Sequence, residues 1–474
     1  MKLGRASAAV AALGALTAAS AKAERPPNIV LILCDDLGYC DVSCYGRTTW
    51  QTPNIDRLAR QGTLFRRWYC AAPVCCASRA ALLTGKYGLH NGVSSNGADL
   101  AAGEVTLARA LKAHGYATAM YGKWHGGGPR APRTTPLNPL DEGFDEFVGF
   151  TNAVAAWQKF PKELWHGRTR MPSSGYADTI FADHAVEFIR RPRRAPFFLY
   201  LAFTAPHFNI DAPEADVARF RGRFPERNPA HPYNAIYAAM VTRLDAEIGR
   251  VLRALDTAGL AQNTLVVLTS DQGASFEPGN HGASAFHDSN YPFRGEKCTL
   301  WEGCLRVPGI VRWPGQTPAH AVSDEVIHGI DVMPTLLAAA GGLPDPAWRV
   351  DGLNVLDVWR GRAHAPLRTV FWDYRCYGYN QIAALRGDLK LIITGFTPPE
   401  LYDVVRDPVE RRNVIALHPR TAWRLQRELG RWLMSETAAS RQSRGAVGTW
   451  GFPGGSARVP AQVPSAPRMA QPGD

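Results

Sequence analysis

The sequence lacks several features that would place it in common classes of protein. Beyond the N-terminal segment, it has no apolar run long enough to cross a membrane, so no stable membrane span is expected. It contains no zinc-type pair of C-x2-C motifs and no motif typical of nucleic-acid binding. No internal repeat is visible. These absences exclude a nucleic-acid partner and leave an ordinary globular protein as the expected class.

Lysine is scarce, with only 9 among the 53 basic residues. Arginine is therefore the common basic residue of this chain. A lysine that occurs within a motif is slightly more expected to have a specific role there. The formal net charge of +11 fits either a basic solvated surface or attraction to anions. The segment 406–474 holds 11 Arg against 5 acidic residues, so +6 of that charge lies at the C-terminal end of the sequence.

Length and composition indicate a large domain followed by a smaller one. The chain has 474 residues, of which 46% are apolar and 20% charged, which is enough to bury a sizeable core. A basic start, the short apolar stretch 8–19 and the small-x-small sequence Ala21-Lys22-Ala23 are typical of a secretory signal. Residues 1–23 are therefore predicted to be a signal peptide, and the mature protein is expected to be exported, either periplasmic or secreted.

Four apolar runs typical of β-strands are each followed directly, or within a few residues, by polar residues. The runs are Asn28–Cys34, Ala117–Tyr121, Pro196–Phe203 and Thr264–Leu268, and the polar groups after them are Asp35-Asp36, Lys123 with His125, His207, and Asp271-Gln272. Helical patterns alternate with these runs, at 53–62, 105–114, 177–190 and 237–258. Such alternation predicts an α/β fold with a mostly parallel sheet covered by helices on both sides. In such sheets the site lies outside the carboxyl ends of the strands, so the four polar groups are expected to converge.

The composition changes after about residue 365. Short strand patterns follow at 370–375, 381–385, 389–394 and 400–403, and a helix is expected over 421–437. We therefore predict a catalytic α/β domain over 24–366 and a smaller C-terminal α+β subdomain over 367–437, with a short antiparallel sheet and a helix. Residues 438–474, rich in Gly, Pro, Ser and Arg, are expected to form a poorly ordered basic tail.

The stretch Cys70–Leu89 carries the most specific pattern in the chain. Cys75 is followed at the fourth position by Arg79, so in a helical turn both side chains share one face. The order C-x-A-S-R, then A-A-L-L-T-G, resembles the signature of the sulfatase family, formylglycine-dependent members of the alkaline phosphatase superfamily. The resemblance extends from Asn28 to about Asn413 and takes in T-P-N-I-D-R-L, G-K-W-H and the late E-L-Y-D motif. It implies an alkaline-phosphatase-like central sheet.

In that family the motif cysteine is oxidised to formylglycine, whose hydrate is the nucleophile. The resemblance therefore assigns the nucleophile to Cys75, not Cys76, and implies a formylglycine-generating maturation enzyme as a partner. The usual Pro of the motif is Ala77 here. Converting Cys75 would leave eight of the nine cysteines, an even number that permits disulfides.

Carboxylates at two strand ends indicate a site for a hard divalent cation. Asp35, Asp36 and Asp271 offer oxygen ligands, which suit Ca²⁺ or Mg²⁺ and not zinc. The resemblance to the D-D-x-G and S-D-N-G elements implies a calcium site, with Mg²⁺ as the alternative, and adds Gln272 and the modified Cys75 to the ligands. Gln272 replaces the usual Asn, and its longer side chain still offers a carbonyl oxygen.

The same resemblance implies roles for the remaining catalytic residues. Arg79 would hold the nucleophile, Lys123 and Lys297 would bind the sulfate, and His125 would act on the aldehyde hydrate. His207 or Lys297 would give a proton to the leaving oxygen. Four further motif or loop residues stay open between structural and site roles: Arg294, Glu302, His281 and His287.

The predicted activity is that of a sulfuric ester hydrolase, similar to arylsulfatases and N-acetylgalactosamine-6-sulfatases. It would cleave the S–O bond of a sulfated carbohydrate or an aryl sulfate. Two alternatives remain: a phosphonate or phosphate ester hydrolase of the same superfamily, and an inactive relic that binds sulfated glycans without conversion of Cys75.

Overall fold

The computed structural model describes residues 25–101, 103–126, 137–376, 378 and 380–435. The predicted signal peptide 1–23 and the predicted tail 438–474 lie outside the described residues. Within them, no helix is both long and apolar enough to cross a membrane.

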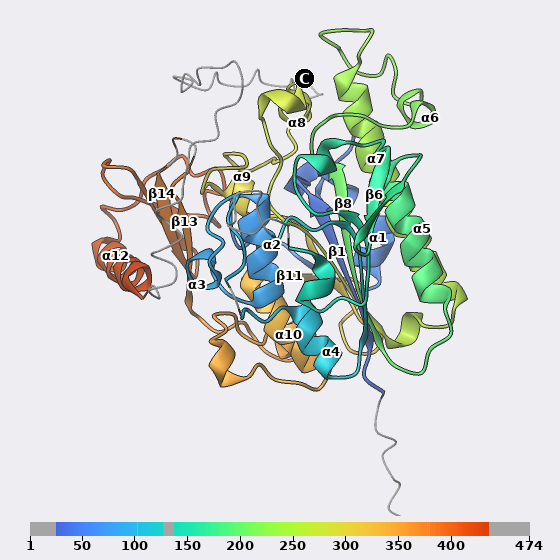
Figure 1. The fold of residues 1–474 in the computed structure, drawn as a ribbon. Helices are drawn as coiled ribbons and strands as arrows, with labels where there is room; N and C mark the ends of the chain where they lie inside the picture. The colour runs from blue at the N-terminus through green and yellow to red at the C-terminus, as the bar shows by residue number, and fades with distance from the viewer. Residues whose placement is uncertain (1–24, 102, 127–136, 377, 379, 436–474) are drawn as a thin grey trace, which may run out of the picture.

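A ten-stranded sheet forms the centre of the molecule (Figure 1). Its strands, in spatial order, are β11 (Ala321–Ser323), β2 (Thr63–Phe65), β10 (Gly309–Arg312), β9 (Thr264–Ser270), β1 (Asn28–Asp35), β8 (Phe197–Pro206), β4 (Ala117–Lys123), β5 (Glu146–Phe150), β6 (Glu163–His166) and β7 (Thr169–Pro172). The five strands from β9 to β5 run parallel, while β10, β6 and β7 pair antiparallel to their inner neighbours. Two short strands, β3 (Trp68–Tyr69) and β12 (Ile327–His328), form a separate parallel ladder.

Helices cover both faces of this sheet, as Figure 1 shows. One side carries α1 (Pro53–Arg60), α5 (Ala177–Arg190) and α7 (Tyr233–Thr257), and the other α2 (Cys75–Thr84), α4 (Leu107–Ala113) and α10 (Val332–Ala339). The shorter helices are α3 (Gly88–Asn91), α6 (Glu214–Val217), α8 (Ala283–Phe286), α9 (Glu302–Leu305) and α11 (Leu356–Trp359). Strand β1 is buried along its whole length, because alternate side chains enter the two cores on opposite faces of the sheet.

A second, four-stranded antiparallel sheet follows near the C-terminal end. It consists of β13 (Thr369–Tyr374), β14 (Gln381–Arg386), β15 (Leu389–Thr394) and β16 (Glu400–Asp403), with α12 (Pro419–Met434) against it. One face of the sheet, including Val370, Trp372 and Ile392, joins the core of the larger unit. The opposite face, including Ala384 and Leu391, packs on α12.

The predicted fold class is confirmed, and most predicted elements lie within a few residues of the observed ones. Helix 177–190 agrees at both ends, whereas α7 begins at Tyr233, one turn before the predicted start. The smaller sheet begins at Thr369, close to the predicted boundary after 366, and the domain limits themselves stay a prediction. The disulfides that an even cysteine number permits do not form: all nine cysteines are free.

Candidate active site

The four polar groups predicted to converge follow four neighbouring strands. In the order β9, β1, β8, β4, the strands end at Ser270, Asp35, Pro206 and Lys123. Cys34 pairs with Ser270, and Asp35 pairs with Pro206, so these ends lie level across the sheet. Asp36, His207 and Asp271 come directly after them. Parallel strands therefore bring residues more than 200 positions apart to one edge of the sheet.

The backbone turns sharply where β1 ends. Asp36 has a left-handed conformation with φ of 60°, which short polar residues tolerate better than other L-residues. Its N–H donates to Asp271 Oδ1 at 3.1 Å, which ties the end of β1 to the end of β9. Gly122 next to Lys123 has φ of 118°, and a Cβ there would come within 1.9 Å of the Ala202 carbonyl oxygen. Only glycine lets β4 approach β8 this closely just before Lys123.

Cys75 faces this edge from the first residue of α2. Val74 before it is extended, and the helix then runs to Thr84 and stops at left-handed Gly85, so the predicted helical turn around Cys75 and Arg79 is confirmed. The Cys75 Sγ lies 4.0 Å from Asp36 Oδ1. Burial raises the pKa of the Cys75 thiol, although Lys123 and Lys297 act in the opposite direction. The unmodified side chain is therefore a neutral thiol.

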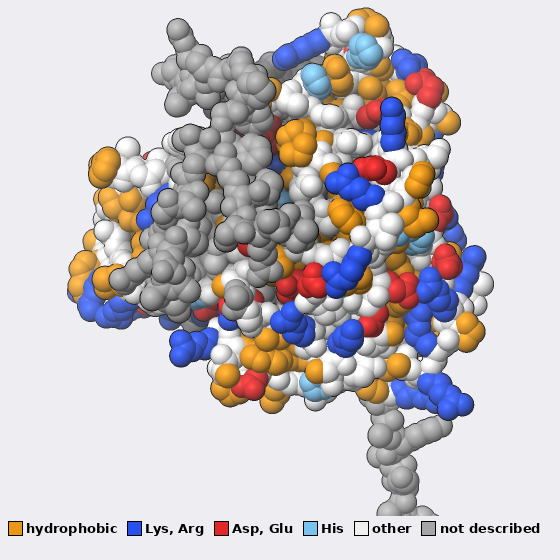
Figure 2. Space-filling model, in the orientation of Figure 1, with side chains coloured by type: hydrophobic (Ala, Val, Ile, Leu, Met, Phe, Trp, Pro, Cys, Tyr) orange, Lys and Arg blue, Asp and Glu red, His pale blue; other side chains and the backbone are white. Residues whose placement is uncertain are grey.

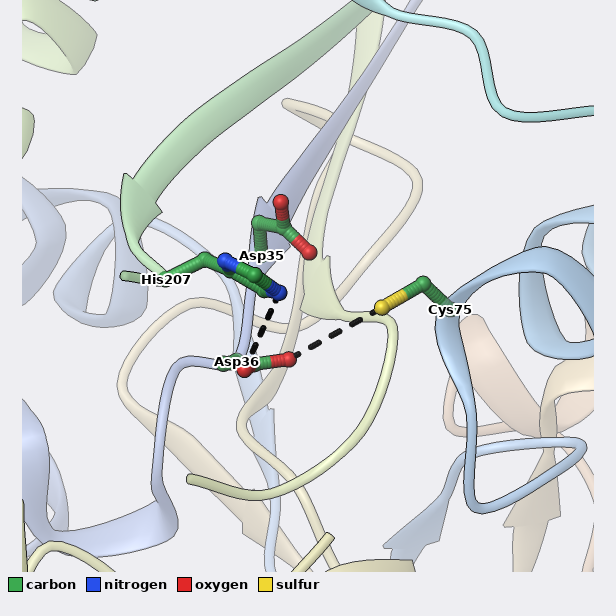
Figure 3. A group of neighbouring side chains, drawn as sticks. All are labelled: Asp35, Asp36, Cys75 and His207. Atoms are coloured by element: carbon green, nitrogen blue, oxygen red, sulfur yellow. Dashed lines mark hydrogen bonds and ion pairs between the residues drawn. The ribbon is translucent and has the colours of Figure 1, made fainter. Parts of the chain in front are cut away.

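Asp36 lies between Cys75 and His207, as Figure 3 shows. Its Oδ2 is 3.6 Å from His207 Nε2. Ligand atoms of Asp35, Asp36, Cys75 and His207 all lie within 4.8 Å of one another, and all four residues are buried. This spacing is compatible with a shared cation, and it brings in His207, which was not among the predicted metal ligands.

Arg79 and Lys123 neutralise the carboxylates on the other side of Asp35. The Arg79 guanidinium lies 2.8 Å from Asp271 Oδ2 and 3.3 Å from Asp35 Oδ1, and it also donates to the Lys123 carbonyl at 2.9 Å. Lys123 Nζ contacts both Asp35 oxygens, at 2.7 and 3.0 Å. Burial alone would raise the pKa of Asp35, but the cations Lys123, Arg79 and Lys297 outweigh it and hold that pKa well below its usual value.

Lys297 joins the site from the loop before α9. Its Nζ lies 3.0 Å from Asp36 Oδ2, 3.0 Å from His207 Nε2 and 3.3 Å from Glu277 Oε2. Burial disfavours the charged ammonium, but Asp36 outweighs it and holds the pKa of Lys297 well above its usual value. Since Lys297 is the donor, His207 Nε2 accepts, and the His207 proton resides on Nδ1, which donates to the Phe208 carbonyl.

The donor set fits a divalent cation. Four carboxylates (Asp35, Asp36, Asp271 and Glu277) face three cationic side chains (Arg79, Lys123 and Lys297), so the cluster carries one formal negative charge. Burial raises the pKa of Asp36 to about 7 and that of Asp271 to about 6, despite their cationic partners. Gln272 Oε1 is buried and has no hydrogen-bond partner among the described residues. A bound cation would relieve the carboxylate repulsion, and with the Gln272 amide turned over it would also give the unpaired oxygen a partner.

The predicted metal ligands do not all face the same way. Gln272 turns its Nε2 toward Cys75 Sγ, at 3.3 Å, and donates a short hydrogen bond to Asp36 Oδ1. The Asp271 carboxylate is occupied by Arg79 and by two backbone N–H groups, those of Asp36 and Gln272. Asp271 borders the group of four close ligand atoms, and its place among the ligands stays a prediction.

His125 completes the set of predicted residues at this edge. It is buried just beyond β4, and its Nδ1 has no hydrogen-bond partner in the part of the chain that the structure describes. Burial lowers the pKa of His125 well below its usual value, and Lys123 and Arg79 lower it further. A neutral imidazole with an open ring nitrogen can accept a proton.

The four residues that the sequence left open take structural positions. Glu302 is fully buried between Lys390 and Arg306, each at 2.8 Å, and Arg294 lies over the Trp301 ring at 3.7 Å. His287 Nε2 donates to the Asn234 carbonyl oxygen at 2.9 Å, and His281 stacks on Tyr233 with ring centroids 3.9 Å apart.

Three groups near the site were not identified from the sequence: the buried Ser78 and Lys159, and the half-buried Glu277. Glu277 pairs with Lys297, and Ser78 Oγ donates to the Asp271 carbonyl. Lys159 donates to the Thr204 carbonyl at 2.7 Å, three residues before His207. Ser78 lies inside the quoted motif, so its place beside Arg79 was a usable signal. Glu277 and Lys159 sit in irregular segments where no spacing marks them.

Comparisons with known proteins agree with this geometry. Residues 27–342 match the family described as Sulfatase, and residues 295–437 match "N-sulphoglucosamine sulphohydrolase, C-terminal". The chain is 32% identical to the steryl-sulfatase of Mus musculus, over 84% of this chain and 80% of that protein. It is 33% identical to the N-acetylgalactosamine-6-sulfatase of Rattus norvegicus, over 80% of this chain and 73% of that protein.

Solved structures show the same architecture. Ps i-CgsB in complex with k-i-k-neocarrahexaose superposes with a TM-score of 0.79 at 27% identity, covering 89% of this chain and 98% of that one. The phosphonate monoester hydrolase of Agrobacterium radiobacter superposes with a TM-score of 0.61 at 21% identity, covering 88% of this chain and 96% of that one, a likeness of fold alone.

Proposed function

Because the chain belongs to the sulfatase family of sulfuric ester hydrolases, we propose that it hydrolyses sulfate esters by S–O cleavage through a formylglycine formed at Cys75. The proposed substrates are sulfated carbohydrates or aryl sulfates. The relative named for a sulfated sugar supports the first class, and the relative named for a steryl sulfate supports a small-molecule sulfate ester.

The observation that carries the proposal is the position of Cys75. Its sulfur lies at the first residue of α2, against Asp36 and Gln272 and within the field of Lys123 and Lys297. A buried thiol with a raised pKa is a poor nucleophile, because the reactive form is the thiolate. Formylglycine would supply an oxygen nucleophile at the same position.

A divalent cation, Ca²⁺ with Mg²⁺ as the alternative, would be held by Asp35, Asp36, Asp271, Gln272 and the modified Cys75. When bound, it would polarise a sulfuryl oxygen and lower the barrier electrostatically. The formal negative charge of the cluster supports the proposal that activity depends on a bound divalent cation. Adding a divalent cation would make the cluster positive and therefore complementary to a sulfate ester, which is a monoanion.

The cationic side chains would bind and orient the sulfate group. Lys123 and Lys297 both point their ammonium groups at the aspartate cluster, where sulfuryl oxygens would lie, and Arg79 holds Asp35 and Asp271 in place. Lys297 is the better proton source for the departing oxygen, because His207 Nε2 carries no proton in the observed pairing. His125, neutral and with a free Nδ1, would accept a proton.

The test is co-expression with a formylglycine-generating enzyme, followed by the mass of the peptide that contains Cys75 and by assays on 4-nitrophenyl sulfate. We expect the mass of an aldehyde in place of the thiol, and turnover that Cys75→Ala abolishes. Cys76→Ala is the matched control, because Cys76 Sγ points away to the Ala98 carbonyl at 3.5 Å, and it should keep activity.

Two results would decide against the proposal. Faster turnover of 4-nitrophenyl phosphate or of a phosphonate ester than of the sulfate would favour a phosphonate or phosphate ester hydrolase. A thiol at Cys75 in all protein from the native host, together with binding of sulfated glycans, would favour an inactive relic. Export to the periplasm or the medium is part of the proposal and can be followed by fractionation.

A further inference from the structure

One face of helix α12 is buried against the protein, and the opposite face is exposed. Ala422, Leu425, Leu429 and Trp432 are buried against the outer face of the four-stranded sheet. This spacing is the apolar stripe of an amphipathic helix, and it accounts for the attachment of α12 to the protein. The catalytic residues lie beyond the opposite face of that sheet, so the open face of α12 is remote from them (Figure 1).

The open face is a row of arginines. Arg420, Arg424, Arg427 and Arg431 follow one another at intervals of four, three and four residues, so they share one side of the helix over ~16 Å. All four are exposed, and none forms an ion pair with another described residue. We call these four residues the α12 arginine face. Figure 2 shows basic side chains gathered over α12 at the lower left.

An aromatic ring completes this surface. Trp423 is 60% exposed, and the Arg427 guanidinium lies 4.4 Å from its ring centroid. The acidic residue of the same surface, Glu428, accepts a hydrogen bond from Thr369 Oγ1 at the sheet, and with its one negative charge the four arginines keep this surface at a net charge of +3.

We propose that the α12 arginine face binds a sulfated polysaccharide chain, an inference that rests on the proposed sulfatase function. The planar guanidinium group of arginine can donate two parallel hydrogen bonds to the oxygens of a sulfate group. Four guanidinium groups in a row, none of them in an ion pair with a described residue, suit a linear polyanion better than a single ion. Trp423 offers a flat apolar surface between two of these cations. The surface would hold a polymeric substrate on the enzyme while a sulfated residue of the chain occupies the site.

A lipid surface fits these observations less well. Membrane-bound amphipathic helices insert their apolar face, whereas the apolar face of α12 is already buried in the protein. Across the span of the four arginines, residues 420–431 of α12, Trp423 is a single exposed large apolar side chain surrounded by arginines.

The test compares two variants that remove the same charge. One replaces Arg420, Arg424, Arg427 and Arg431 by Gln. The control replaces four exposed arginines elsewhere, Arg60, Arg190, Arg194 and Arg253, by Gln. Binding is measured to heparin, to fully desulfated heparin, to duplex DNA and to vesicles of anionic phospholipid, with urea unfolding to verify that both variants are folded.

We expect the α12 variant to lose heparin affinity by roughly tenfold or more, with a weaker dependence on salt, because several charge contacts disappear together. The control should lose about twofold, as expected from net charge alone. Wild-type protein should bind desulfated heparin and vesicles much more weakly than heparin. Equal losses in the two variants, or equal binding of DNA or vesicles, would overturn the proposal.

Turnover separates this inference from the proposed function. Both variants should hydrolyse 4-nitrophenyl sulfate at the wild-type rate, whereas KM for a sulfated polysaccharide should rise only in the α12 variant. Absence of any sulfate ester turnover by matured wild-type protein would refute the proposed function. Normal turnover with unchanged heparin affinity in the α12 variant would refute the inference alone.

Discussion

At the scale of a single residue, Gln272 is the point where this chain departs from the motif it resembles. Its amide nitrogen donates toward Asp36 and Cys75, and its oxygen is buried without a partner among the described residues. Such an oxygen costs about 1–3 kcal/mol. Turning the amide over would press the oxygen against the Asp36 carboxylate, which is unfavourable unless a cation lies between them.

We therefore expect Ca²⁺ at a hundredfold excess over Kd to stabilise wild-type protein by about 2.7 kcal/mol, and so to raise its melting temperature above that in a chelator. Gln272→Leu should weaken Ca²⁺ binding by roughly tenfold, because it removes the amide oxygen. Gln272→Asn is the control that keeps an oxygen. Calorimetric titration of protein with unconverted Cys75 gives the readout, and equal affinities for the Leu variant and wild type would contradict the prediction.

At the scale of an element, the end of β8 is held by a buried pair of opposite charges. Asp178, near the start of α5, accepts from the Thr204 N–H at 2.8 Å and from the Ala205 N–H at 3.0 Å. Lys159 donates to the Thr204 carbonyl from the other side. Burial lowers the pKa of Lys159 to about 8, and Asp178 is the main charge that opposes this. The two residues fix the backbone just before His207.

Lys159→Met should displace His207 and, through it, Lys297. We expect kcat/KM to fall roughly tenfold to a hundredfold for alkyl sulfates. The fall should be smaller for 4-nitrophenyl sulfate, whose leaving group needs little protonation.

Lys162→Met, an exposed change three residues away, is the matched control and should leave both rates unchanged. A uniform loss for good and poor leaving groups would show that Lys159 acts on stability and not on proton transfer.

At the scale of the whole molecule, a buried charge cluster joins the two units. Lys390 of β15 lies 2.8 Å from Glu302 of α9 and 2.6 Å from Glu410, and all three side chains are fully buried. Burial raises the pKa of Glu410 to about 7 against the attraction of Lys390. Burial also opposes the ionised form of Glu302, but Lys390 and Arg306 outweigh it and lower that pKa. Lys390 therefore offsets two carboxylates at once.

Lys390→Met should lower the free energy of unfolding by about 3–5 kcal/mol, because it leaves buried carboxylates without their cation. Lys112→Met makes the same replacement in an exposed ion pair, with Asp145 at 2.6 Å, and should cost at most about 1 kcal/mol. Urea unfolding near neutral pH measures both. Similar losses in the two variants would mean that the buried cluster does not stabilise the junction of the units.

Local patterns were sufficient to predict the elements that build the site. The apolar run before Asp35 predicted β1, and the spacing of Cys75 and Arg79 placed both on one turn of α2. Strand and helix alternation predicted a mostly parallel sheet, and the rule for carboxyl ends predicted that Lys123, His207 and Asp271 converge. These inferences succeeded because hydrophobic periodicity and strand direction are local properties of the chain.

The partners of each charge could not be predicted in the same way. The approach of His207 to Asp36, the pairing of Glu277 with Lys297 and the burial of Lys390 between two glutamates join segments that are far apart or irregular. The same holds for α12, which was predicted as a helix, while the sheet face that buries its apolar side was not predicted. The sequence by itself determined which elements form and which strand ends carry reactive groups. Only the tertiary structure decided which charges meet, because burial and electrostatic energies depend on distances that exist after packing.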